Sequence, residues 1–105
     1  MYPPSTAVAQ QPRINAAITE VVREFAPHVV QIRYDIDQDW SGDWAVFFRV
    51  LLSDEASKVE NLHDIASRVR SRMAERVDFS AAGLLSYFYF RSQSEQAAMR
   101  EPSWA

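Results

Sequence analysis

The stretch YDIDQDWSGDW (residues 34–44) spaces its aspartates as a cation site or a catalytic carboxylate pair would. Three structures could account for this stretch: a calcium loop, the Asp-x-Asp pair of a metal-dependent nucleotide enzyme, or the acidic tip of a β-hairpin. The calcium loop fails at positions counted from Asp35. Trp40 stands where that loop needs a glycine, and Val46 stands where it needs a bidentate glutamate.

Asp35 and Asp37 have the spacing of the magnesium-binding carboxylates in minimal nucleotidyltransferases. Such enzymes also hold the substrate phosphates with a Gly-Ser turn upstream, and no glycine occurs here between residues 12 and 34. A carboxylate pair without that turn provides metal affinity but no substrate geometry. We therefore interpret the stretch as a hairpin tip, in which Asp and Ser side chains bond to their own backbone and Gly42 supplies a positive φ.

The composition is poor in the residue types that build other catalytic sites. The sequence contains Gly 2 and Cys 0, which excludes glycine-rich phosphate loops, thiolate metal sites and cysteine nucleophiles. His28 and His63 have no ligand partner at helical spacing, and no Ser/His/Asp set can be assembled. We therefore expect no catalytic residue, no metal and no cofactor. The formal net charge of −3 gives no overall attraction to nucleic acid.

Hydrophobic periodicity predicts the elements that position these residues. Residues 12–25 repeat apolar side chains at three- and four-residue steps, as an amphipathic helix does. Residues 29–36 and 44–52 alternate between two faces and predict two strands joined as a hairpin. Ser57 and Glu60 have the spacing of a capping box and predict the start of a second helix. The apolar stripe of that helix is Val59, Leu62, Ile65, Ala66, Val69 and Met73.

A third strand follows Gly83, where the sequence LLSYFYFRS is rich in aromatic side chains. The order α-β-β-α-β predicts an α+β fold, with both helices on one face of a three-stranded sheet. This arrangement resembles a ferredoxin-like fold without its first strand. Ser92 and Glu95 have capping-box spacing and predict a short C-terminal helix that ends before Pro102.

The chain divides into three parts by composition. Residues 1–11 are small, polar and proline-containing, and we expect them to form a flexible N-terminal arm. Residues 12–92 form the single α+β domain, and residues 93–105 form a C-terminal tail. Trp104 in this tail either anchors the chain to a partner or folds back over its own sheet.

The predicted sheet has an outer face that the two helices leave uncovered. If Ile32 and Phe48 point to the helices, Arg33, Phe47 and Arg49 point to the outer face. The third strand adds either Tyr87, Tyr89 and Arg91 or Ser86, Phe88 and Phe90. The first set interleaves arginines with aromatics, as RNA-binding sheets and protein–protein hot spots do. The predicted partner-binding residues are Arg33, Phe47, Arg49, Tyr87, Tyr89, Arg91 and Trp104.

The segments DWSGDWAVFFRVLLSDEAS and YFYFRSQSEQA resemble small bacterial proteins encoded beside HEPN-domain proteins, in loci like those of toxin–antitoxin pairs. The resemblance covers residues 35–57 and 86–105. It implies a helical HEPN-type partner, the ribonuclease toxin, which the small protein neutralises. The small partner in such loci is often a nucleotidyltransferase, and because this chain lacks the Gly-Ser turn, we expect neutralisation by binding. No functional residue is carried over from the resemblance.

These observations together predict a non-enzymatic, antitoxin-like interaction module that binds a helical HEPN-type partner. One alternative is an RNA- or DNA-binding module that uses the same arginine and aromatic face. Another is a degenerate nucleotidyltransferase-like enzyme that works through Asp35 and Asp37. The uncovered sheet face also admits a homo-oligomer. No secretory leader or membrane span is visible and cysteine is absent, which favours a cytoplasmic protein.

Overall fold

The computed structural model describes residues 5–105 of the chain. The helices are α1 (Ser5–Ala9), α2 (Gln11–Glu24), α3 (Val59–Arg76) and α4 (Gln93–Met99), followed by a 3-10 turn, η1 (Pro102–Trp104). The strands are β1 (Val29–Gln38), β2 (Trp44–Leu52) and β3 (Leu85–Ser92). The predicted order α-β-β-α-β is confirmed, and so is the predicted short C-terminal helix, which is α4, whereas α1 is a helix that the sequence did not predict.

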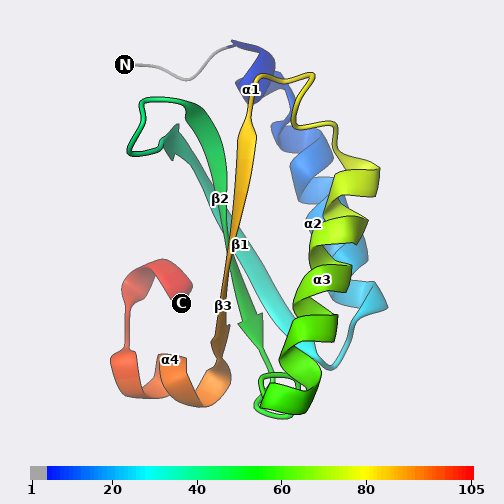
Figure 1. Cartoon of the computed structure of the whole chain (residues 1–105), viewed down its shortest axis with the longest axis vertical. Helices are drawn as coiled ribbons and strands as arrows, with labels where there is room; N and C mark the ends of the chain where they lie inside the picture. The colour runs from blue at the N-terminus through cyan, green and yellow to red at the C-terminus, as the bar shows by residue number, and fades with distance from the viewer. Residues whose placement is uncertain (1–4) are drawn as a thin grey trace.

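The strands form one mixed sheet in the order β1-β2-β3. β1 and β2 form an antiparallel hairpin, and β3 runs parallel to β2 because α3 returns the chain to the end where β2 begins. Figure 1 shows α2 and α3 on the same face of this sheet. The predicted α+β class, with two helices on one face of a three-stranded sheet, is therefore confirmed.

The hydrophobic core lies between the helices and the inner face of the sheet. β2 forms its centre, because Val46, Phe48 and Val50 have 0% exposed surface. The helical segments add Ile14, Ala17, Val21 and Phe25 from the first predicted stripe and Ile65, Ala66, Val69 and Met73 from the second. The apolar spacing in the sequence thus marks the buried side of each helix.

The side chains of Phe88 and Phe90 on β3 point toward this core. Of the two sets that the sequence allowed for the outer face, this one is therefore excluded. The Phe88 ring stacks on Phe48 with 4.7 Å between the ring centroids. The guanidinium of Arg70 on α3 lies 5.3 Å from the centroid of the Phe90 ring. Because side chains alternate across a strand, the other set points to the outer face. That outer set is Tyr87, Tyr89 and Arg91.

Part of the expected N-terminal arm is folded. Residues 5–9 form α1, and Ala7 is fully buried as a member of the core cluster. The expectation of a flexible arm is therefore wrong for this part of residues 1–11, whereas residues 1–4 lie outside the described residues. The segment STAVA is too short to show a helical period, and tertiary packing decides its structure.

Of the two predicted capping boxes, one forms. At α4, the Ser92 hydroxyl accepts from the Glu95 N–H at 3.0 Å, and the Ser92 N–H donates to the Glu95 carboxylate at 3.1 Å. At the second predicted position, the Ser57 hydroxyl donates to the Ser53 carbonyl oxygen in a turn that precedes α3. The helix begins after that turn, at Val59, which is 92% exposed and outside the core.

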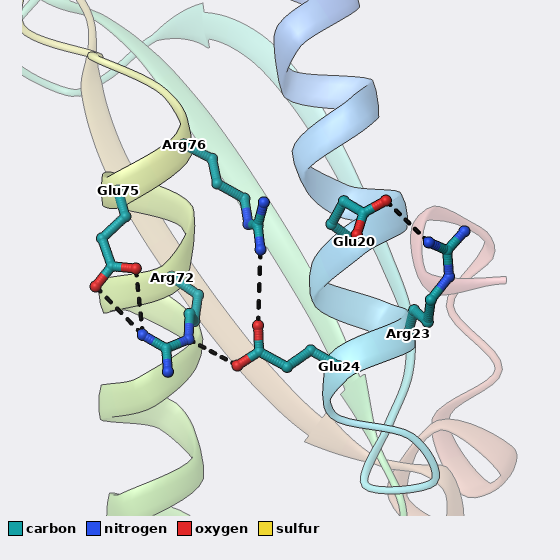
Figure 2. A network of polar contacts seen from close by, with 6 residues as sticks. All are labelled: Glu20, Arg23, Glu24, Arg72, Glu75 and Arg76. Atoms are coloured by element: carbon teal, nitrogen blue, oxygen red, sulfur yellow. Dashed lines mark hydrogen bonds and ion pairs between the residues drawn. The ribbon is translucent and has the colours of Figure 1, made fainter.

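An ion-pair network joins α2 to α3 (Figure 2). The carboxylate of Glu24 on α2 accepts a hydrogen bond from Nε of Arg72 at 2.6 Å and lies 3.8 Å from Arg76. Arg72 also pairs with Glu75 at 3.2 Å. The Glu24 hydrogen bond and the two negative charges raise the pKa of Arg72 above its ordinary value. These side chains are partly solvated, so the network contributes little to the free energy of unfolding.

The C-terminal segment, residues 93–105, folds across the outer face of the sheet. Figure 1 shows α4 and the C-terminus on the side opposite α2 and α3. Trp104 is 7% exposed, and its main-chain carbonyl oxygen accepts a hydrogen bond from Nε2 of Gln31 at 2.9 Å. The expectation of a wholly uncovered outer face is therefore wrong, because the tail docks over the end of the sheet that contains Gln31.

Met73→Ala should lower the free energy of unfolding by roughly 2–5 kcal/mol, because the side chain is fully buried and its removal leaves a cavity. Val59→Ala on the same helix is the matched control. It should change the free energy by less than about 0.5 kcal/mol, because Val59 lies in solvent. Urea unfolding followed by circular dichroism measures both variants, and equal losses would contradict this placement of α3.

Candidate interaction surface

The outer face brings together the residues predicted to bind a partner. Arg33, Arg49 and Tyr89 form one cross-strand row. Phe47 and Tyr87 belong to the next row toward the hairpin tip. The two remaining predicted residues, Arg91 and Trp104, meet at the opposite end of the face. The predicted residues thus lie on one surface, but their surroundings differ along it.

Arg49 is engaged within the chain. Its guanidinium pairs with Asp35 at 2.7 Å, and its Nε donates to the carbonyl oxygen of Ser103 at 2.6 Å. Only 15% of the side chain is exposed. Arg49 therefore links β1 and the C-terminal segment to β2, and little of its charge is presented to solvent.

Arg91 and Trp104 hold the C-terminal segment on the sheet. The guanidinium of Arg91 lies 4.3 Å from the Trp104 ring centroid, which is a cation–π contact. Arg91 also donates to Gln96 at 3.0 Å and pairs with Glu101 at 3.2 Å. Of the two alternatives for Trp104, the structure adopts the one in which the tail folds back over its own sheet.

Arg33 differs from the other arginines of the face because its side chain is exposed. It lines a shallow groove with Asn15 and Thr19 of α2, at the β1 edge of the sheet. No hydrogen bond or ion pair of the described residues includes its guanidinium. Arg33 is thus the arginine of this face whose charge is available to another molecule.

Asp39 closes the hairpin between β1 and β2. Its carboxylate accepts from the Ser41 N–H at 2.9 Å, the Ser41 hydroxyl at 2.7 Å and the Asp43 N–H at 3.0 Å. Gly42 has a φ of 89°, and the Tyr87 hydroxyl of β3 donates to the same carboxylate at 2.8 Å. The predicted self-bonded acidic tip is confirmed, and Tyr87 ties it to the third strand.

These donors stabilise the charged form of Asp39. The Ser41 hydroxyl is the main cause that holds the pKa of Asp39 below its ordinary 3.8, and the Tyr87 hydroxyl and nearby main-chain N–H groups add to it against desolvation. The same contact raises the pKa of Tyr87 above 10.0, because the carboxylate retains the phenolic proton. The hairpin tip is therefore held to β3 by a charge-assisted hydrogen bond.

The hairpin tip presents Trp40, which sequence reasoning missed as a binding residue. Trp40 is 81% exposed, and its ring centroid lies 5.4 Å from that of Tyr87. Tyr87 in turn stacks on Phe47, at 5.3 Å between centroids and 17° between planes. Trp40, Tyr87 and Phe47 form what we call the aromatic line. A tryptophan inside a polar turn, where no core requires it, is the sequence signal that could have identified it.

A cleft of about 590 Å³ lies between the sheet and the C-terminal segment. Phe47, Arg49 and Tyr89 line it from the strands, and Met99 and Trp104 line it from the tail. Tyr89 is 48% exposed and Met99 is 56% exposed, so the cleft opens onto apolar surface. Its acidic lining residues are Asp35, Asp37 and Glu95. Met99 is a second residue that sequence reasoning left out of the binding set.

The carboxylates of the Asp-x-Asp pair are engaged separately. Asp35 binds Arg49, whereas the Asp37 carboxylate accepts from the adjacent Gln38 N–H at 2.7 Å. Among the described residues, no group of three His, Cys, Asp or Glu side chains is placed to hold a metal ion. Within residues 5–105, no helix has the length and apolar character needed to cross a membrane.

Comparison with solved structures identifies C-terminal domains with a ferredoxin-like fold as similar in architecture. One is the copper form of the C-terminal domain of MamM, with a TM-score of 0.55 and 13% identity over 81% of this chain and 88% of that chain. Another is the metal-bound C-terminal domain of the CzcD transporter from Thermotoga maritima, with a TM-score of 0.53 and 15% identity over 79% of this chain and 91% of that chain. At such identity the likeness concerns the fold alone. The sequence matches no protein-family model and no curated protein.

Trp104→Ala should release the C-terminal segment from the sheet, because it removes a buried indole and its contact with Arg91. Hydrogen exchange should show loss of protection across residues 94–104, with a loss of roughly 3 kcal/mol in unfolding free energy. Trp40→Ala is the matched control, since its ring is solvated, and should cost less than about 1 kcal/mol. Unchanged protection in Trp104→Ala would contradict docking through the indole.

Asp39 should titrate below 3.8 in the folded protein, and Ser41→Ala should raise its pKa toward that value by removing the main donor. The pKa is lower in the folded chain than in the unfolded chain. The stabilisation from Asp39 is therefore complete above about pH 4 and is lost as the pH falls through the folded value. NMR titration of the Asp39 carboxyl carbon measures both proteins, and identical titration curves would refute the assigned cause.

Proposed function

We propose that this protein is a non-enzymatic interaction module that binds a protein partner on its outer sheet face. The binding surface runs from the aromatic line, Trp40, Tyr87 and Phe47, to Tyr89 and Met99. The observation that carries the proposal is a tryptophan that is 81% exposed yet supported by Tyr87 and by the hydrogen bonds of the turn. Tryptophan and tyrosine are enriched in binding hot spots. An aromatic side chain that is already ordered in the free protein loses little conformational entropy when a partner binds.

The charges of this surface favour a protein over a nucleic acid. Arg49 and Arg91, which could have paired with phosphates, are 15% and 14% exposed and already face Asp35 and Glu101. Asp35, Asp37 and Glu95 line the cleft, so a phosphate backbone would meet carboxylates there. An apolar partner surface with basic residues at its rim matches this arrangement better.

The partner we propose is a helical, HEPN-type protein, as the resemblance of residues 35–57 and 86–105 implies. An amphipathic helix that inserts its apolar side between the hairpin and the C-terminal segment would contact Phe47, Tyr89 and Met99. The protein would then act as an antitoxin in the cytoplasm, by covering its partner and without chemical modification of it. The separate engagement of Asp35 and Asp37 supports the non-enzymatic form of this proposal.

The copper and metal named for the structural neighbours are not extended to this chain. They belong to proteins 13% and 15% identical to it. In the part of the chain that the structure describes, no three potential metal ligands converge. This chain shares the fold alone with these neighbours, and its proposed function depends on its own surface residues.

Trp40→Ala should weaken binding to the protein encoded by the neighbouring gene by about 30-fold, because a supported hot-spot tryptophan contributes on the order of 2 kcal/mol. Isothermal titration calorimetry after co-purification measures the affinity. Trp40→Phe should retain part of it, and Val59→Ala on the opposite layer should retain all of it.

Salt dependence separates the two partner classes. A protein complex centred on aromatic contacts should lose less than about tenfold in affinity between low and moderate salt, whereas multiple phosphate contacts produce a much steeper fall. Binding of RNA that falls steeply with salt, together with wild-type affinity of Trp40→Ala for the helical protein, would overturn the proposal.

A further inference from the structure

The two edges of the sheet differ in their protection against pairing with another strand. β1 carries a bulge near its start and the exposed charges of Arg33, Asp35 and Asp37. β3 contains neither proline nor lysine, and Arg91, its charged residue, is turned to the C-terminal segment and 14% exposed. Natural edge strands use charges, prolines and bulges to prevent pairing, so β3 is the edge open to a further strand.

The main-chain groups that face this open edge belong to Ser86, Phe88 and Phe90. At the hairpin, the Asp39 N–H donates to the Asp43 carbonyl oxygen at 2.8 Å, so odd-numbered residues of β2 bond to β1. The even-numbered residues of β2 therefore direct their main-chain groups to β3. In a parallel pair, each of them bonds to the two neighbours of the residue that it faces, and because Phe48 faces Phe88, these neighbours are odd-numbered residues of β3. The even-numbered residues of β3 then direct their N–H and C=O groups outward. In the described part of the chain, these groups bond to no other element.

The outward side chains of β3 suit an antiparallel copy of the same strand. Leu85 is 46% exposed and Tyr89 is 48% exposed, and both lie on the outer face with Tyr87 midway between them. A twofold axis at Tyr87 would place Leu85 of each copy opposite Tyr89 of the other. Both exposed apolar side chains would then be covered by the same contact made twice, as an isologous interface requires.

The same twofold axis would place a positive charge of each copy beside a negative charge of the other copy. Arg70 lies over the Phe90 ring at one end of the strand, and Asp78 lines a groove with Leu84 and Leu85 at the other end. No ion pair of the described residues includes either Arg70 or Asp78. The other charged residues that line this groove are Arg13, Glu75 and Arg76, of which the last two are paired within the chain. Antiparallel pairing would bring each Arg70 to the end of the other copy that holds Asp78.

We propose that β3 pairs with β3 of a second copy of this chain, antiparallel and centred on Tyr87. The result is one continuous sheet of six strands, three from each copy. Ser86 and Phe88 of the two copies exchange main-chain hydrogen bonds, and Arg70 of each copy pairs with Asp78 of the other. The contact uses the main-chain edge of β3, whereas the proposed partner protein binds side chains of the outer face, of which Tyr87 and Tyr89 belong to both contacts.

Cysteine cross-linking tests the register, because the chain contains no cysteine of its own. Tyr87→Cys should form a disulfide-linked homodimer under mild oxidation, since facing residues of a pair without main-chain bonds lie about 4.5 Å apart at Cα. Leu85→Cys and Tyr89→Cys should each stay uncross-linked alone and cross-link when mixed. Cross-linking of Leu85→Cys with itself, but not of Tyr87→Cys, would overturn the proposed register.

Charge reversal tests the contact in solution without a covalent link. Arg70→Asp or Asp78→Arg alone should raise the dimer dissociation constant, measured by sedimentation equilibrium, by about tenfold or more. The double variant Arg70→Asp/Asp78→Arg should restore it. Arg68→Asp is the matched control, because Arg68 lies on the same helix over Phe25 and pairs with Asp64, away from β3.

The outcomes distinguish this proposal from the proposed function. A wild-type chain that stays monomeric at high micromolar concentration would overturn the strand pairing, whether or not it binds the helical protein. A dimer in which the double variant fails to recover would likewise overturn it. Loss of partner binding in Trp40→Ala with an intact dimer would support both proposals, because Trp40 lies on the hairpin tip and is not part of the β3 edge.

Discussion

β2 is the strand on which the rest of this structure depends. It is paired on both sides, and its even-numbered side chains are packed into the core from Val46 to Leu52 with no exposed surface. Because side chains alternate along a strand, burying this set forces Phe47 and Arg49 to the outer face. Residues that face each other on paired strands point to the same side of the sheet, so the registers with β1 and β3 determine which of their side chains lie on the outer face. One packing constraint thus determines which residues the protein can present to other molecules.

The outer face is divided by the C-terminal segment. At one end, Arg91 and Trp104 hold the tail on the strands, and the arginines there are neutralised within the chain. At the other end, the hydrogen bonds of Asp39 hold Trp40 in solvent above Tyr87. A surface that resembles an arginine-rich binding face in sequence is therefore, in three dimensions, an aromatic surface with its positive charge largely internal.

The fold and the surface carry different kinds of information. The C-terminal domains of MamM and of the CzcD transporter share the arrangement of elements with this chain at 13% and 15% identity. An α+β layer of this kind is a general solution for burying one face of a small sheet, and it hosts unrelated functions. Beyond that layer, this chain presents the aromatic line, with Trp40 exposed, and an edge strand, β3, without proline or lysine.

Local periodicity and turn chemistry in the sequence predict the order of the main elements, most of the buried positions of α2 and α3, and the self-bonded hairpin tip. The sequence did not determine the fate of Trp104, the exposure of Trp40 or the neutralisation of Arg49. It also left open which face of β3 is buried, and it placed a capping box at Ser57 where the hydroxyl bonds to Ser53 instead. Each of these depends on contacts between residues far apart in the chain or on competition between neighbouring turns. Such contacts form only when the chain folds, so local sequence patterns do not specify them.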